Sequence, residues 1–533
     1  MIDYEFLGLL ANMRTKEIKA SKEGFFSNVK KSFYDIIQQM RARLPLTIFI
    51  CLYLIFTFFT YRNYGLTNDE PVEYLMGKFW YIKMRADDPV LEKSFLLYEG
   101  DNPDIVFYNH WYAGLLYTLN PAENFATYHL LNLLFLLLLF IFSYEALFSQ
   151  GRNSYLSLLG PIFLVLTPRF FGAAATNPKD MPFAVLYLIS LLLIYLTSDY
   201  KSSWRILILG ISFGLTASLR LIGYSIYFIF FCFEAISSKN KSKRLKNLLY
   251  QTLPKTLQIF SIGLLIHLLT QPYLAADPAS NFLKLFSLAR EFPWQQVVLF
   301  AGHLVTATDL PWQYLPVWLL ITTPLFILFF SFWSLEFIRQ SKLAQLMWLA
   351  ILLNLSFYFF LRPVIYDGLR HFLFVVTILS FLAASTFIQI WQQRAKFRII
   401  ISGLFIINAI LVISSYWQLF PFQYIYFNEL VGGVAGAQNS YELDYWGASY
   451  RELVTWTNEN RAQLPAEINL FTCADPLQIS YHAQFTYNLV TDRDKANVIF
   501  CHRRGSTLEQ LKIGYSIYAV KRLGVTLAEI KVL

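Results

Sequence analysis

Four groups of residues stand at the ends of apolar stretches, where their types could do chemistry. The first is Asn68-Asp69-Glu70-Pro71, directly after an apolar run. A carboxylate there could accept the proton of an attacking hydroxyl. Asp and Asn also favour the N-terminus of a helix, where the helix dipole stabilises negative charge. Catalysis and helix capping are therefore both open interpretations of this group, and they are compatible.

The second group follows another apolar run and contains Arg169, Lys179 and Asp180. Lys179 or Arg169 could hold a phosphate through charge-assisted hydrogen bonds, and Asp180 could orient a substrate or a catalytic group. The alternative is an interfacial anchor, because long basic side chains extend their charges to water from helix ends.

The third group, Arg362 to His371, contains two arginines, Asp367 and a histidine. Arg362 and Arg370 suit bidentate binding of phosphate. A surface ion pair between Asp367 and Arg370 is the alternative. Arg220, between two apolar runs, is a weaker candidate of the same kind.

The fourth group, Tyr424 to Gly447, is rich in aromatic residues and glycine and joins the last apolar run to the C-terminal segment. Such aromatic side chains form either a belt at the membrane interface or a wall on which a sugar stacks. The sequence does not separate these two interpretations.

The elements that position these groups are membrane spans. Of the 533 residues, 56% are hydrophobic and only 15% are charged, well below the roughly 25% charge of soluble domains. Eleven apolar stretches approach the roughly 17–25 residues that cross a bilayer. They are residues 45–61, 127–149, 154–172, 181–198, 204–219, 221–237, 254–274, 313–335, 344–361, 369–391 and 397–418.

The net charge of +9 does not indicate nucleic-acid binding, because the basic residues collect in alternate loops. The densest cluster runs from Lys239 to Lys255. By the positive-inside rule these loops are cytoplasmic, which places the N-terminus inside and everything after residue 418 outside. The first apolar run follows a charged segment, so we expect it to remain as a signal anchor. Residues 30–44 predict a basic amphipathic helix on the inner surface.

The outer segments predict helices at the interface and a small domain. Apolar residues recur at helical spacing from Pro71 to Lys83, and further helices are expected at 108–119 and 291–303. In the C-terminal part, 467–473 and 497–501 predict strands, and 448–462 and 507–512 predict helices. Cys473 and Cys501 in that part could form a disulfide in an oxidising compartment.

The predicted fold is a polytopic α-helical membrane protein with about eleven transmembrane helices, outer-face interfacial helices and a small external α/β domain at the C-terminus. We expect the chain to divide into a cytoplasmic amphipathic segment at 1–44, a transmembrane catalytic module at 45–418 and an external domain at 419–533. The expected location is the bacterial inner membrane, crossed many times.

The pattern of motifs resembles the GT-C glycosyltransferases, and within them the protein O-mannosyltransferase and aminoarabinose-transferase group. The resemblance covers nearly the whole chain. The strings that carry it, besides the Asp-Glu pair, are TPRFFGAAATNPKDMPF, LPVWLLITTP, YDGLRHFLFV and YFNELVGG followed by YELDYWG.

The resemblance implies inverting transfer of a sugar from a polyprenyl-phosphate donor to a hydroxyl acceptor outside the cytoplasm, without a cofactor or metal. By match to the Asp-Glu motif, Asp69 is the expected base, with Glu70 beside it organising the site. The expected contacts to the donor phosphate are Arg370, Arg362, Lys179, Arg169 and His371. Asp180 and Asp367 are expected to orient the sugar or acceptor.

The expected partners are membrane lipid, the lipid-linked sugar and an unidentified acceptor. No β-trefoil such as eukaryotic protein mannosyltransferases carry is recognisable, which argues against a protein acceptor. The alternatives are a transporter or lipid flippase and a non-enzymatic scaffold. Transporters usually hold ionisable groups near the bilayer midplane and show repeats. Here the charges cluster at the outer ends of the spans, so we expect loops 62–126, 168–181 and 362–371 to meet at one outward-facing cavity.

Overall fold

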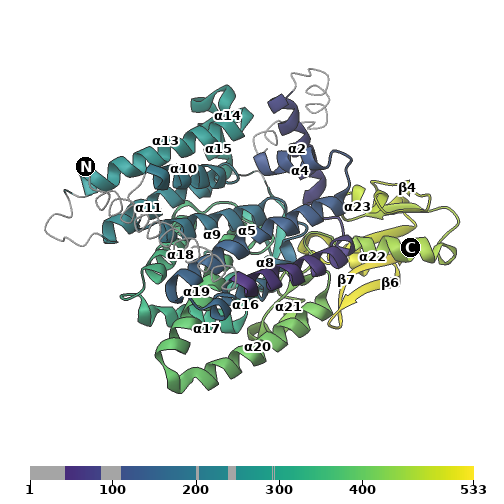
Figure 1. Ribbon diagram of the computed structural model, residues 1–533. Helices are drawn as coiled ribbons and strands as arrows, with labels where there is room; N and C mark the ends of the chain where they lie inside the picture. The colour runs from purple at the N-terminus through teal and green to yellow at the C-terminus, as the bar shows by residue number, and fades with distance from the viewer. Residues whose placement is uncertain are drawn as a thin grey trace, which may run out of the picture.

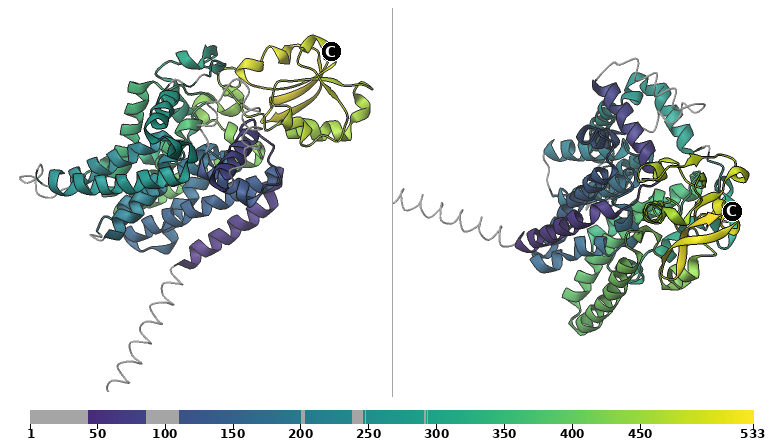
Figure 2. Two further views of the ribbon diagram at one scale, coloured as in Figure 1. Left: turned by 90° about the horizontal axis from the view of Figure 1, so that it is seen from above. Right: turned by 90° about the vertical axis from the view of Figure 1, so that its right-hand side faces the viewer.

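A body of α-helices adjoins a mixed β-sheet formed by the C-terminal segment (Figure 1). The sheet stands at one end of the helical body (Figure 2). This arrangement agrees with the predicted helical fold and C-terminal α/β domain. The computed structural model describes residues 43–85, 110–199, 203–237, 246, 248–290, 292 and 294–533, so all but the last two residues of the helix predicted at 30–44 lie outside the described residues.

In the part of the chain that the structure describes, six helices are long and apolar enough to cross a membrane. They are Arg43–Asn63, Phe125–Gly151 (α5), Leu248–Thr270 (η5 and α13), Lys342–Leu361 (α18), Arg370–Gln393 (η8 and α19) and Ala395–Leu419 (η9 and α20). A seventh span is possible if α16 (Tyr314–Thr322) and Leu325–Phe337 (α17 and η7) cross together, although this pair is bent by 109°.

Four further apolar helices are shorter than a bilayer-spanning helix. They are Ser154–Val165 (α6 and α7), Asp180–Leu196 (α9), Ser203–Ala217 (α10) and Leu221–Ser237 (η3 and α11). Each of the eleven predicted spans therefore coincides with a helix, a bent pair or a short helix in the described part of the chain. By length and composition alone, six or seven of them are sufficient to cross a membrane.

Burial differs sharply between the apolar helices. In α19, side chains such as Phe374 and Phe381 are fully buried. In α20, Ile399 is 87% exposed and Trp417 is 86% exposed. A helix that is apolar on all sides needs protein or lipid around it. Hence α19 forms the centre of the helical body, and α20 presents an apolar surface suited to lipid.

Two of the helices expected at the interface are present, as α2 (Asp69–Arg85) and α4 (Trp111–Leu119). They pack closely because glycine stands at the contact on each helix. A Cβ atom on Gly77 would overlap the carbonyl oxygen of Ala113, and one on Gly114 would overlap the ring of Trp80. Since Asp69 begins α2, this contact helps to fix the place of that carboxylate.

The C-terminal domain has a five-stranded sheet in the order β4-β3-β5-β7-β6. β3 is parallel to β4 and β5, and β7 is antiparallel to β5 and β6. A disulfide joins Cys473, the residue directly after β3, to Cys501 in the adjacent strand β5. The strands are β3 (Asn469–Thr472), β4 (Asn488–Leu489), β5 (Val498–His502), β6 (Tyr515–Arg522) and β7 (Val525–Val532).

The strands predicted at 467–473 and 497–501 are confirmed as β3 and β5. The helix predicted at 448–462 is present as α22 (Tyr450–Glu459) and the turn η12 (Arg461–Gln463). The helix at 507–512 is reduced to two 3₁₀ turns, η14 (Gly505–Thr507) and η15 (Gln510–Lys512). Sequence reasoning missed β4, β6 and β7.

The prediction of a helix at 291–303 is wrong. The described residues there form a hairpin of β1 (Val297–Phe300) and β2 (His303–Thr306). β-branched and aromatic residues favour a strand. The turn between the strands has positive φ angles at Ala301 and Gly302, of 51° and 82°, as two-residue hairpin turns require.

The contact of α2 with α4 generates a test of how Asp69 is held. Gly77→Ala should lower the free energy of unfolding by about 1–3 kcal/mol, because the added methyl group has no space. Thermal unfolding of the purified protein in detergent measures this. Gly403→Ala is the matched control, since a Cβ atom at that helical position meets nothing within 4 Å. A Gly77→Ala protein as stable as wild type would show that the close approach is dispensable.

Candidate active site

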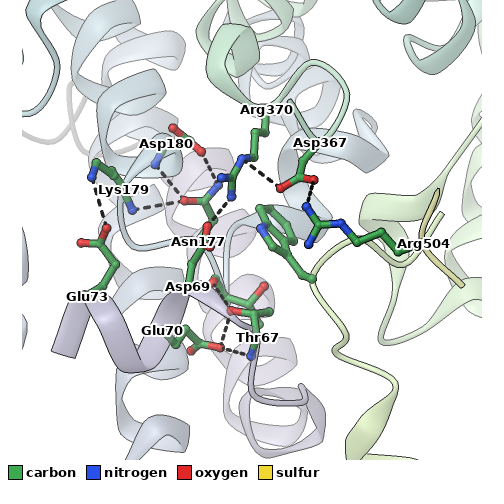
Figure 3. Close-up of polar contacts among 12 residues, drawn as sticks. Thr67, Asp69, Glu70, Glu73, Asn177, Lys179, Asp180, Asp367, Arg370 and Arg504 are labelled. Carbon is green, nitrogen blue, oxygen red and sulfur yellow. Dashed lines mark hydrogen bonds and ion pairs between the residues drawn. The ribbon is translucent and has the colours of Figure 1, made fainter. Parts of the chain in front are cut away.

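One cavity of about 350 Å³ lies where the start of α2, the start of α9 and the segment before α19 meet. Asp69, Lys179, Asp180, Arg370 and His371 all line it. The predicted convergence of the three loops is therefore confirmed for their described residues. The polar side chains of this site are shown in Figure 3.

The start of α2 explains why Asp69 is free to face the cavity. Glu70, and not Asp69, caps this turn: its carboxylate accepts hydrogen bonds from the backbone N–H of Thr67 at 2.8 Å and from the Thr67 hydroxyl at 2.9 Å. Glu70 is 1% exposed, and its other oxygen lies 2.8 Å from Nε2 of His129. The carboxylate of Asp69 is 39% exposed and pairs with Arg370.

These contacts separate the two acidic residues by role. Glu70 does not line the cavity, and its hydrogen bonds within the turn fit the organising role expected for it. Its bonds fix the turn that directs Asp69 toward Arg370 (Figure 3). The capping interpretation thus belongs to Glu70, which leaves the Asp69 carboxylate available for chemistry.

Arg370 is the central cation of the site. Its guanidinium pairs with Asp69 and lies 3.6 Å from the carboxylate of Asp367, which also accepts a hydrogen bond of 2.8 Å from Arg504 of the C-terminal domain. The guanidinium carbon lies 4.7 Å from the centre of the Tyr366 ring. Asp367 does not line the cavity. The sequence predicts that Asp367 orients the sugar, but in the structure its carboxylate contacts two arginines instead.

Lys179 occupies a different wall of the cavity. Its ammonium lies 3.4 Å from a carboxylate oxygen of Glu73, whose other oxygen lies 2.8 Å from Nε2 of His110. Burial by itself would raise the pKa of Glu73. The positive charge of Lys179 and the contact with His110 outweigh burial and lower that pKa from 4.5 to about 2.

Asp180 begins α9 and pairs with Arg220 from the turn before η3. Asn177 fixes this start by accepting the backbone N–H of Asp180 at 2.8 Å and by donating to its carboxylate at 3.0 Å. Both Asp180 and Arg220 line the cavity. Arg220, a weaker candidate from sequence, is therefore part of the site.

Two arginines expected to bind phosphate do not line the cavity. Arg169 is 3% exposed, donates to the carbonyl oxygen of Tyr426 at 3.0 Å and lies over the rings of Trp318 and Phe427. It holds the segment after α20 against the helical body. Arg362 is exposed at the C-terminal end of α18, where its φ angle is 44°.

The rest of the cavity wall is largely apolar. Side chains from η3, α15 (Pro278–Arg290) and the segment before η8 face the ionic wall. These apolar residues are Leu219, Leu221, Ile222, Leu285, Leu288, Phe292, Val364 and Ile365. The site thus combines three ion pairs with an apolar surface, which suits a ligand that is charged at one end and apolar at the other.

Sequence reasoning missed Glu73, His110, His267, Gln271 and Arg504. Glu73 had a signal, because it follows Asp69 by one helical turn and so lies on the same face of α2. His267 and Gln271 line the cavity from α13 and its C-terminal end, and lie 2.7 Å apart. Arg504 belongs to a domain far along the chain and carried no signal.

No family model matches the chain, and no curated protein matches it. Among solved structures it is similar to ArnT from Cupriavidus metallidurans bound to undecaprenyl phosphate, with 12% sequence identity, a TM-score of 0.48, and coverage of 92% of this chain and 98% of that one. The apo state of ArnT from the same organism gives 11% identity, the same TM-score of 0.48, and coverage of 91% and 97%.

The lowered pKa of Glu73 generates a prediction about pH. A carboxylate whose pKa is lower in the folded protein contributes stability above its unfolded pKa and loses it as the pH falls. For Glu73 this contribution to stability is lost as the pH falls from 4.5 to about 2. Glu73→Gln should lower the free energy of unfolding by about 3 kcal/mol at pH 7, and the difference from wild type should narrow below pH 4.5.

Thermal unfolding in detergent between pH 7 and pH 3 measures this difference. Glu509→Gln is the control, because Glu509 pairs with Lys512 on the surface, where the two side chains are 74% and 69% exposed. Its unfolding should match wild type throughout. Parallel pH profiles for Glu73→Gln and wild type would contradict the assignment of an ionised, buried Glu73.

Proposed function

We propose that this protein is an inverting glycosyltransferase of the GT-C type, which transfers a sugar from a polyprenyl-phosphate donor to a hydroxyl acceptor. The observation that carries the proposal is the pairing of Asp69 with Arg370 in a cavity at the ends of apolar helices. The pair supplies a base and a phosphate-binding group at adjacent places. The sequence resemblance to this family supports the same reaction.

In the proposed reaction the acceptor hydroxyl attacks the anomeric carbon from the face opposite the phosphate. The bond between that carbon and the phosphate oxygen breaks, and the polyprenyl phosphate leaves with the electron pair. The hydroxyl proton passes to the carboxylate of Asp69. Arg370 stabilises the negative charge that develops on the leaving phosphate, because a guanidinium binds phosphate oxygens through two parallel N–H groups.

The ion pair of Asp69 and Arg370 implies an exchange of partners. Arg370 cannot give its full charge to a phosphate while Asp69 neutralises it, and the Asp69 carboxylate is not free to meet an acceptor hydroxyl while Arg370 holds it. We propose that the donor phosphate takes the place of Asp69 at Arg370. The carboxylate is then released beside the anomeric carbon, so that donor binding activates the base.

The other two ion pairs of the cavity have supporting roles in the proposed reaction. Arg220 and Lys179 lie on the cavity wall with Arg370 and are proposed to contact the phosphate, each held by its own carboxylate. His371 is proposed to pack beside them, since its ring contacts Tyr366. We propose no cofactor, because a carboxylate can accept the proton directly. The sugar and the nature of the acceptor, whether glycan, lipid or protein, are left open.

We propose that the site faces away from the cytoplasm of the bacterial inner membrane, with the N-terminus inside. The alternating distribution of basic loops supports this orientation. The disulfide of Cys473 and Cys501 supports it as well, because such bonds persist in oxidising compartments.

Asp69→Asn tests the proposed function through two measurements that move in opposite directions. Transfer from a panel of polyprenyl-phosphate sugars should fall by about 10²-fold or more, because asparagine cannot accept the proton. Binding of polyprenyl phosphate should tighten by up to about fivefold, because Arg370 loses a competing carboxylate worth about 1 kcal/mol in a partly exposed pair.

Glu70→Gln is the contrasting variant. It should lower the unfolding temperature through the loss of the buried contact with His129, without tightening binding of the lipid phosphate. A well-folded Asp69→Asn protein that retains most transfer activity would remove Asp69 from the mechanism. Unchanged or weaker binding of polyprenyl phosphate would contradict the exchange of partners.

A further inference from the structure

The C-terminal domain places one side chain against the candidate active site. Arg504 stands in the loop between β5 and η14, and its guanidinium reaches the carboxylate of Asp367 beside Arg370 (Figure 3). The side chain of Arg504 is 12% exposed, and that of Asp367 is 4% exposed. This contact is therefore a buried one between two parts of the protein that are distant in sequence.

Asp367 divides its two oxygens between two arginines. Oδ1 accepts a hydrogen bond of 2.8 Å from Nη2 of Arg504, and Oδ2 lies 3.6 Å from Nε of Arg370. Arg370 meets Asp367 through Nε, and Nη1 of the same guanidinium pairs with Asp69. The orientation of Arg370 toward the cavity thus depends on how Asp367 is held.

A second path from Arg504 to Arg370 runs through aromatic rings. The guanidinium carbon of Arg504 lies 5.5 Å from the centre of the Trp294 ring. Trp294 stacks on Tyr366, with ring centres 4.1 Å apart and planes inclined by 13°. Tyr366 in turn lies 4.7 Å from the guanidinium carbon of Arg370. The ionic and aromatic paths begin and end at the same two residues.

The loop that carries Arg504 is itself fixed. The Thr507 hydroxyl accepts a hydrogen bond of 3.1 Å from the backbone N–H of Arg504. The next N–H, of Gly505, donates to the buried carboxylate of Glu442 at 3.1 Å. A Cβ atom on Gly505 would lie 2.8 Å from that carboxylate, so the loop approaches it as closely as a glycine allows. Arg504 is presented by a rigid turn.

We propose that Arg504 is a positioning residue for the donor-phosphate site, acting on Arg370 through Asp367 and the Trp294–Tyr366 stack. The proposal rests on the proposed function, and it makes the C-terminal domain a structural part of the active site. Without Arg504, Asp367 is a buried carboxylate whose remaining cationic contact is Arg370. It then draws that guanidinium to itself and away from the phosphate.

The test measures the Kd of a polyprenyl phosphate for the purified full-length protein in detergent. Binding is detected by the change in tryptophan fluorescence. Arg504→Gln should raise the Kd about tenfold, equivalent to roughly 1.4 kcal/mol. Adding Asp367→Asn to Arg504→Gln removes the competing carboxylate. The double variant should therefore bind more tightly than the single variant, within about threefold of wild type.

Arg503→Gln is the matched control. Arg503 is the neighbouring residue and also ties the loop between β5 and η14 to a segment distant in sequence, with hydrogen bonds of 3.1 and 3.0 Å to the carbonyl oxygen of Gln438 and 2.7 Å to Asn439. None of these bonds involves Asp367, so the loss of Arg503 should leave the Kd within about twofold of wild type. Equal weakening by both variants would mean general loosening of the domain and would overturn the proposal.

The other outcomes separate a failure of the proposed function from a failure of the positioning role. If the wild-type protein does not bind polyprenyl phosphate, the proposed function fails. If wild type binds but Arg504→Gln binds equally well, or the double variant binds no better than Arg504→Gln, the positioning role fails. Should Arg504→Gln not fold, Arg504→Lys keeps the charge but loses the planar fork and should raise the Kd about threefold. An unchanged Kd in that folded variant would overturn the proposal.

Discussion

Asp367 lies buried between the guanidinium groups of Arg370 and Arg504, and this shared carboxylate joins the helical body to the C-terminal domain. Through Arg370 the same chain of charges reaches Asp69 at the start of α2. Burying an ionised group costs several kcal/mol unless charged partners compensate it, so each member of this chain depends on the next. The arrangement of α2, the segment before α19 and the sheet domain is constrained by that dependence.

The surrounding elements supply rigidity that the charges alone would lack. Glu70 fixes the turn before α2, Asn177 fixes the start of α9, and the α2–α4 contact leaves no room for a Cβ atom at Gly77. The contacts of Glu70 and Gly77 hold Asp69 without using its carboxylate for capping, and the carboxylate of Asp180 gives one oxygen to Asn177. Each of the two carboxylates pairs with an arginine.

The sequence predicts the apolar helices well, because bilayer thickness sets the length and composition of a span. It also predicts the convergence of Asp69, Lys179, Asp180 and Arg370, since all stand at the same end of their spans. It does not say which way a side chain points, and so does not reveal that Arg169 packs against Trp318 and Phe427 and does not line the cavity. Arg504 lies 137 residues from Asp367, and only tertiary packing brings them together.

In the proposed reaction, the ion pairs of the cavity favour a lipid-linked phosphate over free phosphate. Lys179, Arg220 and Arg370 each contact a carboxylate, so a phosphate gains their charge only by displacing an anion already present. Free phosphate has little else with which to offset that loss. A polyprenyl phosphate also covers apolar wall residues, and each Å² of apolar surface removed from water contributes roughly 25 cal/mol. In the proposed reaction, contact with the lipid chain would therefore supply the free energy that opens the Asp69–Arg370 pair and would tie release of the base to the presence of the lipid-linked donor.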